Sequence, residues 1–158
     1  MTIALNDKMP SGQLQELKDG EMITHQTDEL FANKKVVLFA VPGAFTPTCS
    51  AAHLPGYVVN ADEFAAKGVD LIACVSVNDA FVMNAWGAAQ NAEHIAMLGD
   101  GDGSFAKALG LEMETGAFGG LRSQRYAMVI ENGTVTLLNV EKPKEFEVSK
   151  AEAVLAAL

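Results

Sequence analysis

The sequence predicts an α/β fold in which helices flank a mixed central β-sheet and a β-hairpin opens the chain. Three observations support this prediction. Strand-like apolar runs alternate with helix-forming segments between residues 35 and 98, an order typical of α/β proteins. An Asp-Gly turn signal marks the opening hairpin at residue 19, and Asn-Gly marks a second hairpin at residue 132. Since 49% of the 158 residues are hydrophobic, we expect residues 1–158 to form a single domain around one core.

The predicted strands are short runs of apolar or alternating residues, each bounded by turn-forming residues. They span residues 13–17, 21–25, 35–41, 69–77, 95–98, 126–131 and 134–140. The third and fourth runs are mostly apolar along their whole length, as expected of strands covered on both faces. The glycines of residues 110–120 predict a loop before the second hairpin.

The predicted helices lie between these strands and at the end of the chain. They span residues 28–31, 49–67, 79–91 and 105–109, and a last one begins at residue 149. Pro55-Gly56 is expected to kink or divide the second helix, because proline lacks an N–H donor. Asn78 or Asp79 is placed to cap the third helix. Ser149, with Glu152 three residues on, has the spacing of a capping box for the last.

The charge of the chain argues against several classes of partner. The 20 acidic and 11 basic residues give a formal net charge of −9, which opposes binding to nucleic acid or to an anionic membrane surface. No apolar run approaches the roughly 18 residues that span a bilayer. The first residues do not read as a signal peptide, so we expect a cytoplasmic location.

The residues around Cys49 favour a reactive thiol, whereas those around Cys74 do not. Cys49 lies between a buried strand and the start of a helix, where unpaired N–H groups favour an anion such as a thiolate. Thr46, three residues earlier, could offer its hydroxyl across the turn. Pro42 and Pro47 would stiffen the loop and keep one wall of the site apolar.

The segment PGAFTPTC, residues 42–49, resembles the active-site loop of the peroxiredoxin family. The recurring pattern of that loop is Pro, three residues, Thr, two residues, Cys, and it is complete here. The segments HLPGY (53–57), SVNDAFV (76–82) and RSQRY (122–126) resemble the type-five branch, which includes the plant type II enzymes. The resemblance runs from about residue 20 to the end of the chain.

This resemblance implies a thioredoxin-like fold and a thiol-dependent peroxidase that reduces hydrogen peroxide and organic hydroperoxides without a cofactor or a metal. Cys49 would be the peroxidatic nucleophile and would be oxidised to a sulfenic acid. Thr46 would hydrogen-bond the peroxide, Pro42 would shield the sulfur, and Arg125 would steady the thiolate and the peroxide. The permanent charge and fixed donors of an arginine suit that role.

The resemblance also bears on how the enzyme is regenerated and assembled. Some members of the branch carry a resolving cysteine near the C-terminus, but residues 146–149 here contain none, which predicts a one-cysteine form. An external thiol must then reduce the sulfenic acid, and the usual reductants of the family are glutathione with glutaredoxin, or thioredoxin. Phe45, Phe81, Trp86 and Phe118 could be core aromatics, but family members often dimerise beside the active site, so we expect a homodimer in which some of these four side chains lie at the interface.

Three other functions are compatible with a reactive Cys49. A thioredoxin-like disulfide oxidoreductase would need a second thiol at position 46, where the chain has Thr46. A cysteine hydrolase would pair Cys49 with His53, four residues on and on the same helix face. A redox sensor would pass its oxidation to a partner protein. The sensor is the alternative that the sequence leaves open.

Several other residues have a plainer interpretation beside the functional one. Cys74 lies inside a predicted strand and is expected to be an inert core thiol. His53 could help to orient the site, whereas a metal site there would need further ligands that the spacing of the other histidines does not supply. The segment DGDGS, residues 100–104, resembles a calcium loop only faintly, and a turn with a helix cap is expected. Outside the family pattern, Arg125 would be expected to form a surface ion pair.

Overall fold

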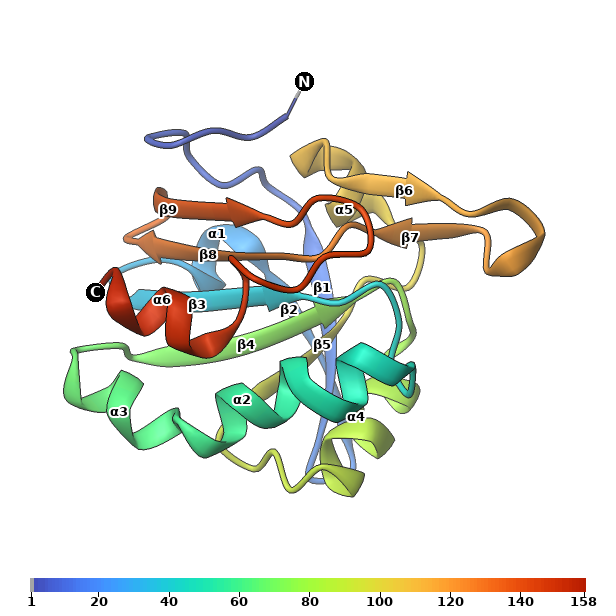
Figure 1. Ribbon diagram of the computed structural model, residues 1–158, viewed down its shortest axis with the longest axis horizontal. Coiled ribbons are helices and arrows are strands. Elements are labelled where there is room, and N and C mark those ends of the chain that lie inside the picture. Colours follow the sequence, from blue (N-terminus) through green and yellow to red (C-terminus); the bar gives the residue numbers. More distant parts are fainter. Residues whose placement is uncertain (1) are drawn as a thin grey trace.

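The computed structural model describes residues 2–158 and is built around a seven-stranded sheet (Figure 1). Its strands are β1 (Gln13–Lys18), β2 (Glu21–Gln26), β3 (Lys35–Ala40), β4 (Leu71–Ser76), β5 (Ala96–Gly99), β8 (Tyr126–Glu131) and β9 (Thr134–Val140). The strand order is β2-β1-β5-β4-β3-β8-β9. β3, β4 and β5 are parallel, and the other neighbours pair antiparallel. The sheet is therefore mixed, and both predicted hairpins are present.

Helices cover both faces of this sheet. They are α1 (Thr27–Leu30), the π-helix η1 (Cys49–His53), α2 (Leu54–Val59), α3 (Ala61–Ala66), α4 (Ala80–Ala89), α5 (Ser104–Leu109), the 3₁₀-helix η2 (Gly116–Phe118) and α6 (Ala151–Ala156). α2, α3, α4 and α6 pack on one face (Figure 1). α1 and α5 pack on the other, together with the N-terminal segment.

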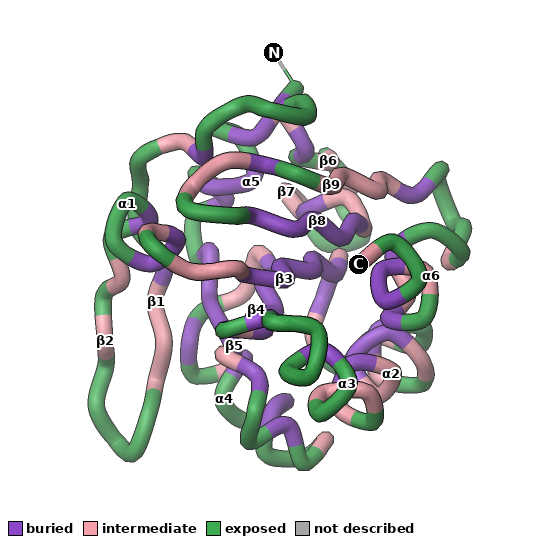
Figure 2. The backbone as a smooth tube through the Cα atoms, turned by 90° about the vertical axis from the view of Figure 1, so that its left-hand side faces the viewer, coloured by how far each residue is buried: buried purple, intermediate pink, exposed green. Residues whose placement is uncertain are grey.

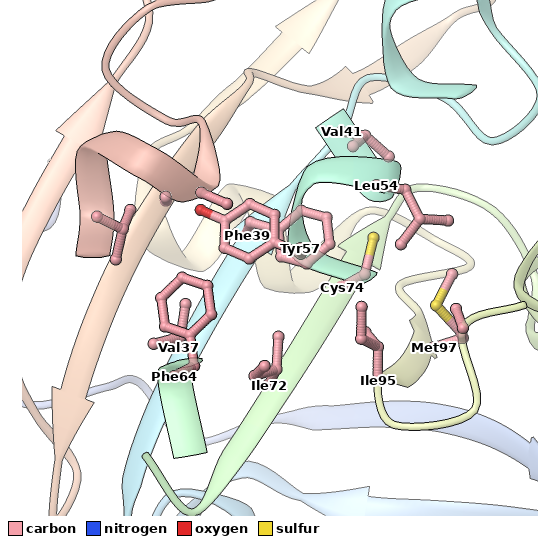
Figure 3. Packing of buried hydrophobic residues seen from close by; sticks show 14 of the residues in the cluster. Val37, Phe39, Val41, Leu54, Tyr57, Phe64, Ile72, Cys74, Ile95 and Met97 are labelled. Carbon is pink, nitrogen blue, oxygen red and sulfur yellow. The ribbon is translucent and has the colours of Figure 1, made fainter. Parts of the chain in front are cut away.

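The central strands are buried on both faces because their side chains alternate between two apolar clusters. In β3, Val37 and Phe39 point toward α2 and α6, whereas Val36 and Leu38 point toward the opposite layer. The rings of Phe39 and Tyr57 stack with centroids 4.0 Å apart and an interplanar angle of 4° (Figure 3). Figure 2 shows how burial concentrates along these inner strands while the tip of the β1–β2 hairpin is exposed.

The helical segment after β3 divides at a different residue from the one predicted. Pro55 and Gly56 lie inside α2, and the proline follows directly on the last turn of η1. The preceding turn is of π type, since Leu54 N–H donates to the carbonyl of Cys49, five residues back. The break comes instead at Asn60, whose side-chain amide donates to Gly56 O at 2.8 Å.

The predicted loop at residues 110–120 contains secondary structure. β6 (Glu112–Glu114) and β7 (Leu121–Ser123) form a second, two-stranded sheet, and η2 lies between them. β6 has no apolar face, because Glu112 and Glu114 are exposed, and β7 is only three residues long. The hydrophobic pattern that identifies a strand is therefore absent from this segment.

Of the predicted helix caps, the one before α4 is confirmed and the one at Ser149 is wrong. The Asp79 carboxylate accepts from Val82 N–H at 2.9 Å and caps α4. Ser149 is not the cap of α6, whose N-cap residue is Lys150 without a side-chain cap. The Glu141 carboxylate accepts from the hydroxyl and from the N–H of Ser149 at 2.6 and 2.8 Å. It thus binds the N–H that Glu152 would bind in a capping box.

The segment at residues 100–104 caps α5. The Asp100 carboxylate accepts from the N–H groups of Phe105 and Ala106 at 3.0 and 2.9 Å, and Asp102 accepts from Ser104 N–H. Burial raises the pKa of Asp100, although these N–H bonds oppose the shift. No helix within residues 2–158 is long and apolar enough to cross a lipid bilayer.

Candidate active site

The register of the central strands brings three distant segments together at one end of the sheet. Ala40, the last residue of β3, pairs with Tyr126, the first residue of β8, so that Arg125 lies beside the loop that leaves β3. Tyr126 also pairs with Val140 of β9, and Glu141 N–H donates to Arg125 O at 2.9 Å. The loop carrying Cys49, the arginine and the segment after β9 therefore meet at this edge.

The loop between β3 and η1 is held in an uncommon conformation. Phe45 has φ of 62°, a left-handed backbone that costs energy for a bulky residue. The neighbouring residues support the turn. Thr46 donates its hydroxyl to Gly43 O at 2.5 Å, and Thr46 O accepts from Ser50 N–H at 2.9 Å. Asn78, from the segment after β4, accepts from Ala44 N–H at 3.1 Å.

Cys49 is the first residue of η1 and has no exposed surface. Arg125 Nη2 donates to Cys49 Sγ at 3.1 Å. A guanidinium is always protonated, so this contact places a permanent positive charge against the sulfur. The sequence predicted an α-helical first turn at Cys49. The structure has a π-helical turn there, with the arginine as the charged partner of the sulfur.

The other arm of the same guanidinium contacts His53. Arg125 Nη1 donates to His53 Nδ1 at 2.8 Å, and His53 Nε2 lies 3.1 Å from the carbonyl of Ser149. Both ring nitrogens are thus used by groups other than Cys49. A thiol–imidazole pair needs a free ring nitrogen facing the sulfur, so the geometry does not support the cysteine hydrolase alternative.

The structure therefore brings together Cys49, Arg125 and the loop that carries Pro42 and Thr46. The single proton of the Thr46 hydroxyl is donated to Gly43 O, which leaves the lone pairs of its oxygen available to accept from an incoming O–H group. Pro42 is half-buried at the start of the loop, and its carbonyl accepts from another arginine.

That arginine, Arg122, is a residue to which sequence reasoning gave no role. Its Nη1 donates to Pro42 O at 2.8 Å, and its guanidinium lies 5.8 Å from the centre of the Phe118 ring. A Cβ atom at Gly43 or at Gly119 would collide with this guanidinium. The two glycines are thus the signal in the sequence, but the contact joins residues 80 positions apart and no local pattern predicts it.

Cys74 lies in β4 and has no exposed surface, as expected of a core thiol. Its sulfur belongs to the apolar cluster beneath α2, near Leu54 (Figure 3). Burial and the neighbouring Cys49 raise the pKa of Cys74 well above its ordinary value, so the side chain stays a neutral thiol. Both cysteines are free.

The four aromatic side chains considered as interface candidates differ in exposure. Trp86 is fully buried, and its indole N–H donates to Ser50 Oγ at 3.0 Å. Phe45, Phe81 and Phe118 are 57%, 64% and 83% exposed. No cluster of three or more His, Cys, Asp or Glu side chains suited to a metal ion occurs within the described residues, 2–158.

The family model for Redoxin matches residues 4–155 of the chain. Peroxiredoxin-2D of Arabidopsis thaliana is 45% identical over 99% of this chain and 98% of its own length. This chain belongs to the peroxiredoxin family. Peroxiredoxin-2C of Oryza sativa is 48% identical over the same shares of the two chains. These relatives establish that the chain is a thiol-dependent peroxidase.

A solved structure agrees closely with the fold of this peroxiredoxin. Reduced Prx3 from Vibrio vulnificus, crystallised in complex with hydrogen peroxide, has a TM-score of 0.97, 69% sequence identity and 99% coverage of both chains. The architecture is therefore thioredoxin-like, as the resemblance of the sequence implied. This likeness and the relatives above establish the fold and the family, and the roles of individual residues rest on the geometry.

Proposed function

We propose that this peroxiredoxin reduces hydrogen peroxide and organic hydroperoxides through a sulfenic acid at Cys49. The observation that carries the proposal is the 3.1 Å contact from Arg125 Nη2 to Cys49 Sγ. The solved relative that binds hydrogen peroxide supports this choice of substrate. Hydrogen-bond donors around the reacting atoms are the largest source of stabilisation when charge moves in a transition state.

The first step of the proposed reaction is attack of Cys49 on the hydroperoxide. The Cys49 thiolate attacks one oxygen of the hydroperoxide, an S–O bond forms, and the O–O bond breaks. The negative charge passes from the sulfur to the leaving oxygen, which takes up a proton and departs as water or an alcohol. Arg125 can face the charge at both ends of this transfer, and the Thr46 oxygen can accept from the peroxide O–H. Pro42 screens the sulfur from water.

We also propose that an external thiol completes the cycle, so that the enzyme works as a one-cysteine form of the type-five, or plant type II, branch. Residues 146–149 contain no cysteine, and Cys74 is buried in β4. One thiol would attack the sulfenic acid to give a mixed disulfide and water, and a second would release Cys49 as a thiol. Glutathione with glutaredoxin, or thioredoxin, would supply these electrons in the cytoplasm.

We further propose a homodimer whose interface lies beside the active site. Three exposed phenylalanines flank the site loop from different segments. Phe45 is part of the loop. Phe81 lies three residues after Asn78, which binds the loop. Phe118 packs on Arg122, which binds Pro42. Aromatic side chains are enriched at protein interfaces, and a two-fold dimer would bury this surface against its own copy.

The peroxidase chemistry is tested by mixing reduced protein with one equivalent of hydrogen peroxide. We expect rapid loss of one thiol and a mass gain of one oxygen atom. Cys49→Ser should abolish both changes, and Cys74→Ser should preserve them. Consumption of peroxide by Cys49→Ser at the wild-type rate would refute the proposal. Steady-state turnover with glutathione and glutaredoxin, compared with thioredoxin and its reductase, then identifies the electron donor.

A further inference from the structure

His53 makes no hydrogen bond to the Cys49 sulfur, but it is fully buried and both of its ring nitrogens have hydrogen-bond partners. The imidazole has no exposed surface. The rings of Phe39, Tyr57 and Phe146 surround it at centroid distances of 5.0, 5.7 and 5.1 Å. Within this apolar surround, its two nitrogens meet Arg125 and the carbonyl of Ser149. The ring therefore links the side chain of the arginine at the sulfur to Ser149, in the segment after β9.

The two hydrogen bonds fix the protonation of this imidazole. A guanidinium has no acceptor, so Arg125 must donate and Nδ1 of His53 must be the unprotonated nitrogen. The proton then lies on Nε2, which donates to Ser149 O at 3.1 Å. Burial, followed by the Arg125 charge, lowers the pKa of His53 to about 3, although Ser149 and Glu141 oppose the shift. The ring therefore stays neutral and keeps its acceptor toward the arginine.

The far end of this link is itself held in place. The Glu141 carboxylate accepts from the N–H and the hydroxyl of Ser149 at 2.8 and 2.6 Å and from Glu147 N–H at 2.8 Å. Tyr57 donates its hydroxyl to the same Ser149 carbonyl at 2.7 Å. Burial raises the pKa of Glu141, but these hydrogen bonds prevail and the pKa is lowered. Hydrogen bonds to Glu141 and Tyr57 therefore hold the Ser149 carbonyl, which orients His53, in one position.

We propose that His53 is a positioning residue for peroxide reduction, holding the Arg125 guanidinium against Cys49 by a hydrogen bond anchored at Ser149. This inference rests on the proposed role of Arg125. An arginine side chain has several rotatable bonds, and only one of its arms reaches the sulfur. Without the second arm fixed at His53, the guanidinium would sample other orientations over the Phe146 ring, which lies 5.8 Å from it. Misplacement of a catalytic group by about 1 Å can cost roughly 100-fold in rate.

Two polar substitutions separate positioning from packing. In His53→Asn, the amide oxygen lies near the position of Nδ1 and can still accept from Arg125. In His53→Gln, the longer side chain carries its amide toward Ser149 and leaves the arginine without that acceptor. Both variants lose the ring, so a role in packing alone would affect them alike. His25→Gln is the matched control, because His25 pairs with Glu16 on the β1–β2 hairpin.

The rate constant for peroxide is measured by stopped flow through the single tryptophan, Trp86, which bonds the residue next to Cys49. We expect His53→Gln to lower it by roughly 10- to 100-fold, His53→Asn to lower it much less, and His25→Gln to leave it unchanged. Alkylation of Cys49 by iodoacetamide, which needs no aligned O–O bond, should change far less than the peroxide reaction. Equal losses in the Asn and Gln variants, or equal losses in both reactions, would overturn the inference.

A double-mutant cycle with Arg125→Gln separates this inference from the proposed function. If His53 acts through the arginine, His53→Gln should have almost no further effect on the peroxide rate in the Arg125→Gln background. Additive losses would contradict positioning through Arg125. An unchanged rate in Arg125→Gln alone would instead remove the arginine from the proposed mechanism. Thermal unfolding of each variant shows whether it is folded under the conditions of the assay.

Discussion

At the residue scale, the site depends on one guanidinium that serves two acceptors. Arg125 contacts the Cys49 sulfur with one arm and the His53 ring with the other. Its backbone is fixed as well, because its carbonyl accepts from Glu141 N–H. Position and direction of the charge are thus set from both ends of the side chain.

We predict that Arg125→Gln lowers the rate constant for hydrogen peroxide by at least about 100-fold, the usual cost of losing one preorganised donor. Arg125→Lys should recover only part of the loss, because a lysine ammonium is a point charge that does not reproduce the fork of donors. Stopped-flow fluorescence of the reduced variants measures both rates. Wild-type kinetics in Arg125→Lys would show that charge alone suffices.

His53 also makes a prediction about stability. The pKa of His53 is about 3 in the folded protein and 6.5 in the unfolded chain. Between these two pH values only the unfolded state binds the proton. The contribution of His53 to the free energy of unfolding should therefore be fully present above pH 6.5. Below that pH the free energy of unfolding should fall, with a slope approaching about 1.4 kcal/mol per pH unit for one proton.

This stability prediction is checked by urea unfolding at several pH values from 7 down to about 5, above the range in which carboxylates titrate. In His53→Gln the position no longer titrates, so the slope should be smaller over the same interval. Identical slopes in the two proteins would mean that His53 takes up its proton without unfolding.

At the scale of elements, the loop between β3 and η1 is tightly packed, and glycines leave the space that a larger side chain fills. Gly43 and Gly119 leave the space that the Arg122 guanidinium fills, and Arg122 in turn binds Pro42 O. The loop is thereby attached to β7 as well as to the strand it leaves.

We predict that Gly43→Ala slows peroxide reduction by at least roughly 10-fold, because the added methyl group displaces Arg122 and shifts the loop by a fraction of an ångström or more. It should also destabilise the fold by about 1–3 kcal/mol, as overpacking does. Gly12→Ala is the control, since a Cβ atom there meets nothing within 4 Å. Similar kinetics in the two variants would argue against a tightly fitted loop.

Features of the fold that depend on local interactions could be predicted from the sequence, whereas those that depend on contacts between distant residues could not. Strands and hairpins were predictable because apolar alternation and the Asp-Gly and Asn-Gly turns are local signals. β6 and β7 were missed because each is three residues long and neither contains an apolar run. The cap at Ser149 was predicted wrongly because the Glu141 carboxylate, eight residues away, binds the Ser149 N–H that Glu152 would bind in a capping box. A local pattern cannot show such competition.

The site shows the same division. The loop pattern pointed to Pro42, Thr46 and Cys49, and the family resemblance added Arg125. The hydrogen bonds from His53 to Arg125 and to Ser149, which orient the arginine side chain, join residues 72 and 96 positions apart. These pairs are set by strand register, which the sequence specifies only through the whole fold.

At the scale of the whole molecule, the exposed aromatic surface around the loop stands out against a chain of net charge −9. Like charges on two copies repel one another, so an apolar contact area is what a homodimer would need. Phe45, Phe81 and Phe118 are the exposed phenylalanines next to the site. Their placement would put two active sites on either side of one two-fold axis.

We predict that Phe81→Glu shifts the proposed homodimer to a monomer, because it would bury two carboxylates near each other at a two-fold interface. Sedimentation equilibrium of wild type and variant measures the dissociation constant. Val59→Glu is the control, since Val59 is 81% exposed on α2 and lies outside this surface. Monomeric wild-type protein at micromolar concentrations would refute the proposed dimer.

The contact between His53 and Ser149 has a consequence for the order of events during synthesis. Residue 149 leaves the ribosome 96 residues after residue 53, long after the cysteine itself has been made. A nascent chain that already carries Cys49 therefore has neither the arginine nor the anchor that directs it. The thiol is produced early, and the arrangement that makes it reactive toward peroxide is completed only when the strands on both sides of it are in place.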